Sequence, residues 1–307
     1  MDAEESFQAE GSGAPESPDP VAKGEEGEEA LLTDENEEGI PLEDVDRVGR
    51  RVELALCVLY VVVVMVIFQG PLNIEPTERP IPVQYLESTG DYIRNLSLDA
   101  EHNGETISDF VLILCGVLLP LIFQLILAYV VHRHSDALKG IQDRHCTLCA
   151  YFTSFATNLM VTEFLKAYCG SLRPLYYYLC QPDEKYEVCL QESGSLARDA
   201  RKSFPSGHAS ISFSGLVLLT LYLNQKYGTD SLRNNNPPPQ VEYYRAVRKA
   251  RCMSLVALLP MALALFFSSS RLHDNEHFAG DVVGGAVIGF AIGYYFHTNI
   301  WFCRGYQ

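Results

Sequence analysis

The 307-residue sequence predicts an all-α polytopic membrane protein whose six transmembrane helices form a bundle. Six stretches are apolar and approach the roughly 20 residues that a helix needs to cross a bilayer. Basic residues gather in alternate connections between these stretches, whereas acidic residues gather near the N-terminus. We therefore expect two parts, an N-terminal tail over 1–46 and a membrane domain over 47–303.

The tail carries the whole formal net charge of −16, because residues 1–46 contain seventeen Asp or Glu residues and only one basic residue, Lys23. It has too few apolar side chains to offset the entropy lost on ordering, so we expect it to be disordered. Residues 1–30 contain no apolar core, so we expect no cleavable signal peptide. An acidic tail beside a remainder of zero net charge argues against nucleic acid as a partner.

The six predicted spans differ in strength. The second is the clearest and should kink at Pro120, whereas Thr, Ser and Asn residues interrupt the third and the fourth is short. The sixth carries Gly284, Gly285, Gly289 and Gly293, a small-residue face suited to close helix packing. In order, the spans are 52–69, 110–131, 147–165, 208–223, 253–269 and 282–302.

The distribution of Lys and Arg predicts the orientation. Basic residues precede the first span and fill the connections 132–146 and 224–251, which places these segments and both termini in the cytosol. The other three connections then face the lumen or the exterior, in the plasma membrane or an endomembrane. Asn95 begins an Asn-Leu-Ser glycosylation triplet that is usable only on that side. The connection 166–207 contains six Lys or Arg residues against this rule, and we assign several of them to chemistry.

Nine cysteines are scattered along the chain. Cys146 and Cys149 form one CxxC pair, but no second pair completes a zinc pattern. Cys180 and Cys189 share one connection, and their separation permits a disulfide in an oxidising compartment without requiring one.

Three polar segments lie at helix ends on the predicted lumenal or extracellular side. Taken singly, they resemble snorkelling cations, an ordinary turn and a helix cap. Together they bring three cations and two histidines to one level of the membrane. The residues are Lys166 and Arg173 after the third span, Ser206, Gly207 and His208 at the start of the fourth, and Ser270, Arg271, His277 and Asp281 between the fifth and sixth.

The three cations predict an anion site. Lys166, Arg173 and Arg271 would repel one another without an anion between them, and a phosphate monoester supplies about two negative charges. Ser206 and Gly207 begin a helix, where free N–H groups and the helix dipole favour anions, and Gly207 lets the backbone approach closely. The cluster lacks the several carboxylates that magnesium needs and the ligands that zinc needs, so we predict no metal or other cofactor.

His277 and Asp281 are four residues apart. If the last helix begins early enough, Asp281 can accept a hydrogen bond from one imidazole nitrogen and leave the other as a nucleophile. His208 is then placed to protonate a leaving alkoxide as a general acid. His273 is the main competitor for either role. The pattern predicts hydrolysis of a phosphate ester in two steps.

The three segments match K-x6-R-P, P-S-G-H and S-R-x5-H-x3-D, and in this order they resemble the signature motifs of the type 2 phosphatidic acid phosphatase superfamily. Over residues 50–302, the six spans and the long third-to-fourth connection are similar to its lipid phosphate phosphatases. The resemblance implies His277 as nucleophile, Asp281 as its orienting partner and His208 as acid–base residue. It implies phosphoryl binding by Lys166, Arg173, Ser206, Gly207, Ser270 and Arg271.

The resemblance further implies magnesium-independent hydrolysis of phosphatidate, lysophosphatidate, sphingosine 1-phosphate, ceramide 1-phosphate or diacylglycerol pyrophosphate through a phosphohistidine. The substrate and the surrounding membrane lipids are the expected partners, and the sequence leaves open which lipid is preferred and whether the chain forms a homo-oligomer. One departure is Phe278, where close animal members of the family typically have a second His.

Four alternatives compete with this interpretation. A catalytically silent scaffold on the same fold is one, and a lipid or ion carrier that uses the polar cluster as a translocation site is another. Soluble vanadate haloperoxidases share the motifs, but the apolar spans argue against them. A sugar phosphatase of the glucose 6-phosphatase type would be expected to have nine spans.

Overall fold

The computed structural model describes residues 42–69, 74–133, 137–190, 195–228 and 240–300. The chain divides into two units, Met1–Asp46 and Arg47–Gln307. Almost all of the predicted tail lies outside the described residues. Where the description starts, the chain is already helical, because α1 (Leu42–Gln69) begins four residues before the end of the first unit.

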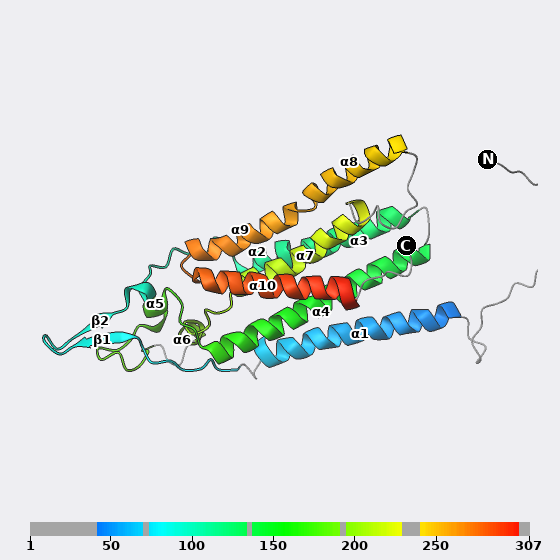
Figure 1. The fold of residues 1–307 in the computed structure, drawn as a ribbon. Coiled ribbons are helices and arrows are strands. Elements are labelled where there is room, and N and C mark those ends of the chain that lie inside the picture. Colours follow the sequence, from blue (N-terminus) through cyan, green and yellow to red (C-terminus); the bar gives the residue numbers. More distant parts are fainter. Residues whose placement is uncertain (1–41, 70–73, 134–136, 191–194, 229–239, 301–307) are drawn as a thin grey trace, which may run out of the picture. The chain divides into compact units, whose positions relative to one another are not determined.

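Helices dominate the second unit and follow one another in alternating directions (Figure 1). The second predicted span is one continuous helix over Asp109–His132, in which the π-helical η2 (Leu114–Leu118) lies between α2 (Asp109–Ile113) and α3 (Leu119–His132). Pro120 lies in the first turn of α3, directly after η2, so the expected irregularity occurs as a π-helical segment. The other long helices are α4 (Ala137–Cys169), α7 (Gly207–Tyr227), α8 (Gln240–Val256) with α9 (Leu259–His273), and α10 (Ala279–Tyr295) with the π-helical η4 (Phe296–Ile300).

Four of the described helices are long and apolar enough to cross a membrane. They cover Asp46–Phe68, Asp109–His132, Glu242–His273 and Ala279–Asn299, which contain the second and fifth predicted spans and nearly all of the first and sixth. The third and fourth predictions fall in α4 and α7, and some of the polar side chains of these two helices hydrogen-bond to one another in the interior. For example, the amide of Asn158 donates to Ser210 Oγ at 3.2 Å, and both residues are buried.

Glycines bring α10 into backbone contact with α7. A Cβ on Gly285, Gly289 or Gly293 would lie 2.4, 2.1 or 2.7 Å from the carbonyl oxygens of Ser206, Ser210 and Ser214, respectively. These three glycines therefore form the close-packing face predicted from the sequence. Gly284 lies against the ring of Phe204 instead.

The all-α prediction misses one feature, a two-stranded antiparallel sheet in the connection after α1. Its strands β1 (Val83–Leu86) and β2 (Asp91–Arg94) pair in a register that sets Val83 opposite Arg94. The short η1 (Leu96–Leu98), α5 (Tyr176–Cys180) and α6 (Ser195–Asp199) lie in the connections at the same end of the bundle (Figure 1). A disulfide joins Cys180 to Cys189 in their buried core.

Candidate active site

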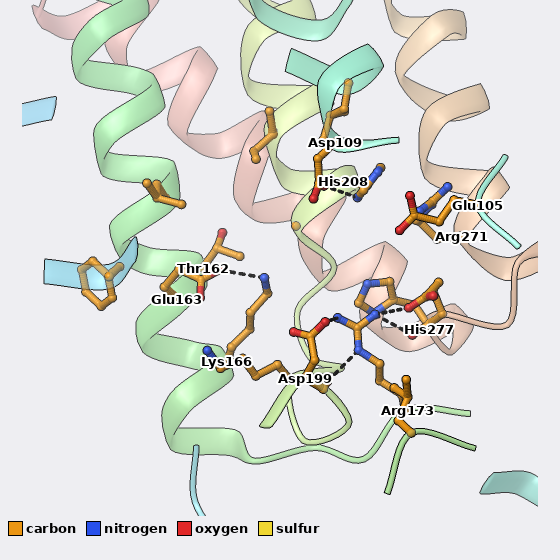
Figure 2. Close-up of a pocket in the computed structure, with 18 of the residues that line it drawn as sticks. Glu105, Asp109, Thr162, Glu163, Lys166, Arg173, Asp199, His208, Arg271 and His277 are labelled. Carbon is orange, nitrogen blue, oxygen red and sulfur yellow. Dashed lines mark hydrogen bonds and ion pairs between the residues drawn. The ribbon is translucent and has the colours of Figure 1, made fainter. Parts of the chain in front are cut away.

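A cavity of about 810 Å³ opens among the helix ends that carry the three motifs. Figure 2 shows that the labelled Lys166, Arg173, His208, Arg271 and His277 surround it. Gly207 also lines the cavity, whereas Ser206, Ser270 and Asp281 lie behind it. The structure therefore brings residues from α4, α7, α9 and the α9–α10 connection to one place, although more than a hundred positions separate the first from the last.

The end of α4 positions Lys166. Gly170, with φ of +54°, follows the helix in the left-handed conformation that glycine adopts readily at a helix C-terminus. The Lys166 ammonium donates to Glu163 Oε1 at 2.7 Å, one turn earlier on the same helix. A Cβ on Gly207 would lie 3.2 Å from Lys166 Nζ, so the missing side chain gives this ammonium its room beside the start of α7.

Arg173 lies beyond the turn and is fixed by two other segments. Its Nε donates to the Asp199 carbonyl at 2.8 Å, and its Nη1 pairs with Glu276 Oε2. The Asp199 carboxylate lies 3.7 Å from Nη2. These contacts aim the guanidinium toward His277 in the cavity (Figure 2).

The start of α7 positions His208. Ser206 is the N-cap residue of α7, and its own N–H donates to the Asp281 carbonyl at 3.0 Å, which ties α7 to α10. His208 Nε2 lies 3.0 Å from the Ile107 carbonyl, so this nitrogen carries a proton and donates it in the hydrogen bond. The other ring nitrogen, Nδ1, lies 3.7 Å from Asp109 Oδ1.

Arg271 is almost completely enclosed, with 2% of the residue exposed. Its Nη2 donates to Asp274 Oδ2 at 2.6 Å and to the Ile107 carbonyl at 2.9 Å. Its Nε donates to Ser270 Oγ at 3.2 Å. Ser270 thus holds Arg271 in place from behind, and the Ile107 carbonyl joins Arg271 to His208.

His277 and Asp281 do not share a helix, because α10 begins only at Ala279. His277 Nδ1 is 3.9 Å from Asp281 Oδ2, which is too long for the direct hydrogen bond that the sequence predicts. Asp281 Oδ2 instead accepts hydrogen bonds from Ser203 Oγ at 2.6 Å and from the Phe278 N–H at 2.9 Å. In the described part of the chain His277 Nδ1 is buried without a hydrogen-bond partner. Asp281 therefore fixes the backbone around His277 and not the imidazole itself.

Burial is the main cause that lowers the pKa of His277, and the positive charges of Arg173 and Lys166 lower it further. The imidazole is 5% exposed and lines the cavity. A neutral imidazole is the form that can act as a nucleophile. The competitor His273 is exposed and does not line the cavity, whereas His277 is buried and lines it.

The sequence interpretation missed the carboxylates of the site. It held that the cations need an anion between them, but each already has a partner: Glu163 for Lys166, Glu276 for Arg173, and Asp274 for Arg271. It also held that carboxylates are lacking, whereas the cavity is lined by Glu105, Asp109, Glu163, Asp199 and Glu276. Among the described residues these carboxylates form no cluster with metal-ligand spacing. Two of the pairs could have been found from their i,i+3 spacing.

Comparisons with known proteins agree with the three motifs. The model of the PAP2 superfamily matches residues 147–304. Diacylglycerol pyrophosphate phosphatase 1 of Saccharomyces cerevisiae is 25% identical over 79% of this chain and 78% of its own length. Two Arabidopsis thaliana proteins are similar over shorter stretches: lipid phosphate phosphatase 2 is 29% identical over 66% of this chain and 64% of its own length, and lipid phosphate phosphatase 1 is 30% identical over 48% and 43%.

No solved structure matches the chain. The matched segment holds every residue from Lys166 to Asp281 and makes up more than half of the sequence. The chain belongs to the PAP2 superfamily.

Proposed function

We propose that this protein is a lipid phosphate phosphatase that hydrolyses phosphate monoesters of lipids through a phosphohistidine, without magnesium. The observation that carries the proposal is a single cavity with two kinds of lining. Cations and histidines line one part, and apolar side chains of α1, α4 and α7 line the other, including Met65, Phe68, Phe155, Leu159 and Ile211. An amphiphile with a phosphate head fits this combination.

The position of the apolar lining on α4 supports a lipid tail. Phe155 precedes Lys166 by eleven residues, which corresponds to about 16 Å along a helix at 1.5 Å per residue. The cavity therefore extends from the phosphate-binding level toward the middle of the bundle. A phosphate held at Lys166 leaves room for an acyl chain beside Phe155 and Leu159.

The chemistry proceeds in two displacements on phosphorus. His277 Nε2 attacks and forms a P–N bond while the P–O bond to the lipid breaks. The leaving alkoxide takes the proton on Nδ1 of His208, which is an imidazolium at this step, while the Nε2 proton stays hydrogen-bonded to the Ile107 carbonyl. Water then attacks the phosphohistidine, His208 takes up the proton of that water, and the P–N bond breaks to release phosphate. Lys166 has three N–H donors and Arg173 has five, so their pairing with carboxylates leaves donors for the phosphoryl oxygens.

Six spans and a lumenal or extracellular site are part of this proposal. The helices alternate in direction, and α4 and α7 would be the two further spans, shielded from lipid on their polar sides. Asn95 is exposed in the connections at the cavity end, as glycosylation requires. Disulfides do not decide the orientation, because Cys180–Cys189 lies at the cavity end and Cys146 is disulfide-bonded near the other end of α4. Glycan attachment at Asn95 and protease cleavage within 224–251 from the cytosolic side would support the proposed orientation. Cleavage of that connection only from the exterior would show that the orientation is the opposite one.

The decisive test is phosphate release by purified, detergent-solubilised protein in EDTA. Mixed micelles should carry phosphatidate, lysophosphatidate, sphingosine 1-phosphate, ceramide 1-phosphate or diacylglycerol pyrophosphate, with glucose 6-phosphate as the soluble control. We expect release from at least one lipid, inhibition by vanadate, whose trigonal-bipyramidal form resembles the phosphoryl transition state, and little release from the sugar phosphate. Release from no lipid would favour a silent scaffold or carrier. Loss in EDTA with recovery on adding magnesium would contradict the metal-free mechanism.

A further inference from the structure

Four side chains with metal-binding donors meet between α1 and α4, far from the cavity. Glu53 and Cys57 are one helical turn apart on α1, and His145 and Cys149 are one turn apart on α4. His145 precedes Lys166 by twenty-one residues, about 31 Å along the helix. The phosphatase chemistry makes no use of this cluster.

The donor atoms of the cluster point at one another. His145 Nε2 lies 2.7 Å from Glu53 Oε2 and 3.6 Å from Cys149 Sγ. The thiol of Cys57 lies near enough to Cys149 and Glu53 to interact with them electrostatically. The ligand atoms of Glu53, His145 and Cys149 all lie within 4.8 Å of one another. Cys146, the neighbour of His145, is engaged in a disulfide and is excluded as a ligand.

This arrangement suits a tetrahedral ion. Zinc bonds of about 2.0–2.3 Å to nitrogen, oxygen and sulfur place tetrahedral ligand atoms about 3.3–3.8 Å apart. The 3.6 Å between Cys149 Sγ and His145 Nε2 falls in that range, and the distance between His145 and Glu53 would have to widen by under about 1 Å. Cys57, His145 and Cys149 are buried, whereas Glu53 is partly exposed and leaves a path for the ion.

We propose that Glu53, Cys57, His145 and Cys149 form a structural zinc site that fastens α1 to α4. Two thiols lose their protons as the ion binds, giving a site of two thiolates, one imidazole and one carboxylate. Thiolate and imidazole donors together favour zinc over magnesium or calcium. With all four positions filled by protein, the ion has no open position for substrate and is separate from the phosphatase reaction.

The proposed ion would reinforce the ordinary contacts between the two helices. Tyr60 hydrogen-bonds Thr157 at 3.1 Å, and Val64 and Phe68 pack with Ala156 and Leu159. These contacts follow the proposed site along α1 in the direction of Met65 and Phe68, whose side chains line the cavity. Loss of zinc should therefore loosen the α1 wall of the cavity without removing any catalytic group.

The test measures metal in protein purified in detergent after expression with added Zn²⁺. We expect about one zinc per chain in the wild type and in His277→Ala, and at least about tenfold less in Cys57→Ser and Cys149→Ser. Cys252→Ser, which alters an exposed free thiol on α8, is the matched control and should keep its zinc. Retention of zinc in the Cys57→Ser/Cys149→Ser double variant would show adventitious binding and overturn the proposal.

A second measurement on the wild type guards against variants that fail to fold. Bound zinc should slow alkylation of Cys57 and Cys149 at least about tenfold, and a strong chelator should abolish this protection. Replacement by Co²⁺ should add thiolate-to-cobalt absorption that is missing from both serine variants. Unprotected thiols in zinc-supplied protein, or a disulfide between Cys57 and Cys149, would overturn the proposal. Neither measurement depends on lipid hydrolysis, so this site and the phosphatase activity can fail separately.

Discussion

Gly285 offers a direct way to separate α7 from α10. A Cβ at this position would lie 2.4 Å from the Ser206 carbonyl oxygen and 3.1 Å from Ala209 Cβ. Ordinary contacts between heavy atoms begin near about 3.5 Å, so Gly285→Ala must push the helices apart by about 1 Å. Ser206 directly precedes Gly207 and His208, whereas α10 begins just after His277. The substitution therefore displaces the two proposed catalytic histidines relative to each other.

A misplacement of about 1 Å between reacting groups can lower kcat by about 100-fold, and this is the loss we expect for Gly285→Ala. Overpacking should also lower the free energy of unfolding by about 1–3 kcal/mol. Phosphate-release kinetics and thermal denaturation in the same detergent measure both effects. Gly280→Ala, on the same helix, is the matched control, because a Cβ at this position would have no neighbour within 4 Å. Wild-type kcat in Gly285→Ala, or equal losses in both variants, would refute the claim that this contact sets the site.

Three further predictions concern charge. Asp274→Asn removes the carboxylate that pairs with the Arg271 guanidinium, whose side chain is 2% exposed, and leaves a buried charge without its counter-ion. The free energy of unfolding should therefore fall by about 3–5 kcal/mol, and an unchanged thermal midpoint would contradict this. The pKa of His277 lies below the usual 6.5, so the imidazole stays neutral as the pH falls through 6.5. The rate of phosphoenzyme formation in His208→Ala should therefore not decline around pH 6.5, and a decline centred at pH 6.5 would indicate an ordinary histidine. A chain that starts at Arg47 should keep its specific activity, because the cavity lining is drawn from Met65 onward, and a large drop would assign the tail a role.

The convergence of the three motifs could be predicted from the sequence, because each motif lies at the end of an apolar stretch on the same predicted face. Lys166, Arg173, His208, Arg271 and His277 line one cavity as expected. The spacing of two residues in the sequence was a less reliable guide to the distance between their side chains. The four-residue interval before Asp281 predicted one helical face, but α10 starts after His277, and the resulting separation is 3.9 Å.

The missed contacts join distant parts of the chain. Arg173 and Glu276 are 103 positions apart, and nothing in either local sequence indicates that they pair. The same holds for α1 and α4, where Glu53 meets His145 across 92 positions. Polar residues in α4 also weakened the third predicted span, because the sequence does not show that Asn158 bonds to Ser210 of α7 in the interior.

Covalent labelling of His277 tests the central claim most directly. Protein mixed with phosphatidate that carries ³²P, and quenched in alkali, should hold a label that survives alkali and is lost in acid, as a phosphorus–nitrogen bond requires. Peptide mapping should place it on His277. His277→Ala should show neither label nor turnover at an unchanged thermal midpoint, whereas His208→Ala should still become labelled when the leaving group is good. Label on any other residue, or normal turnover by a folded His277→Ala variant, would contradict the account.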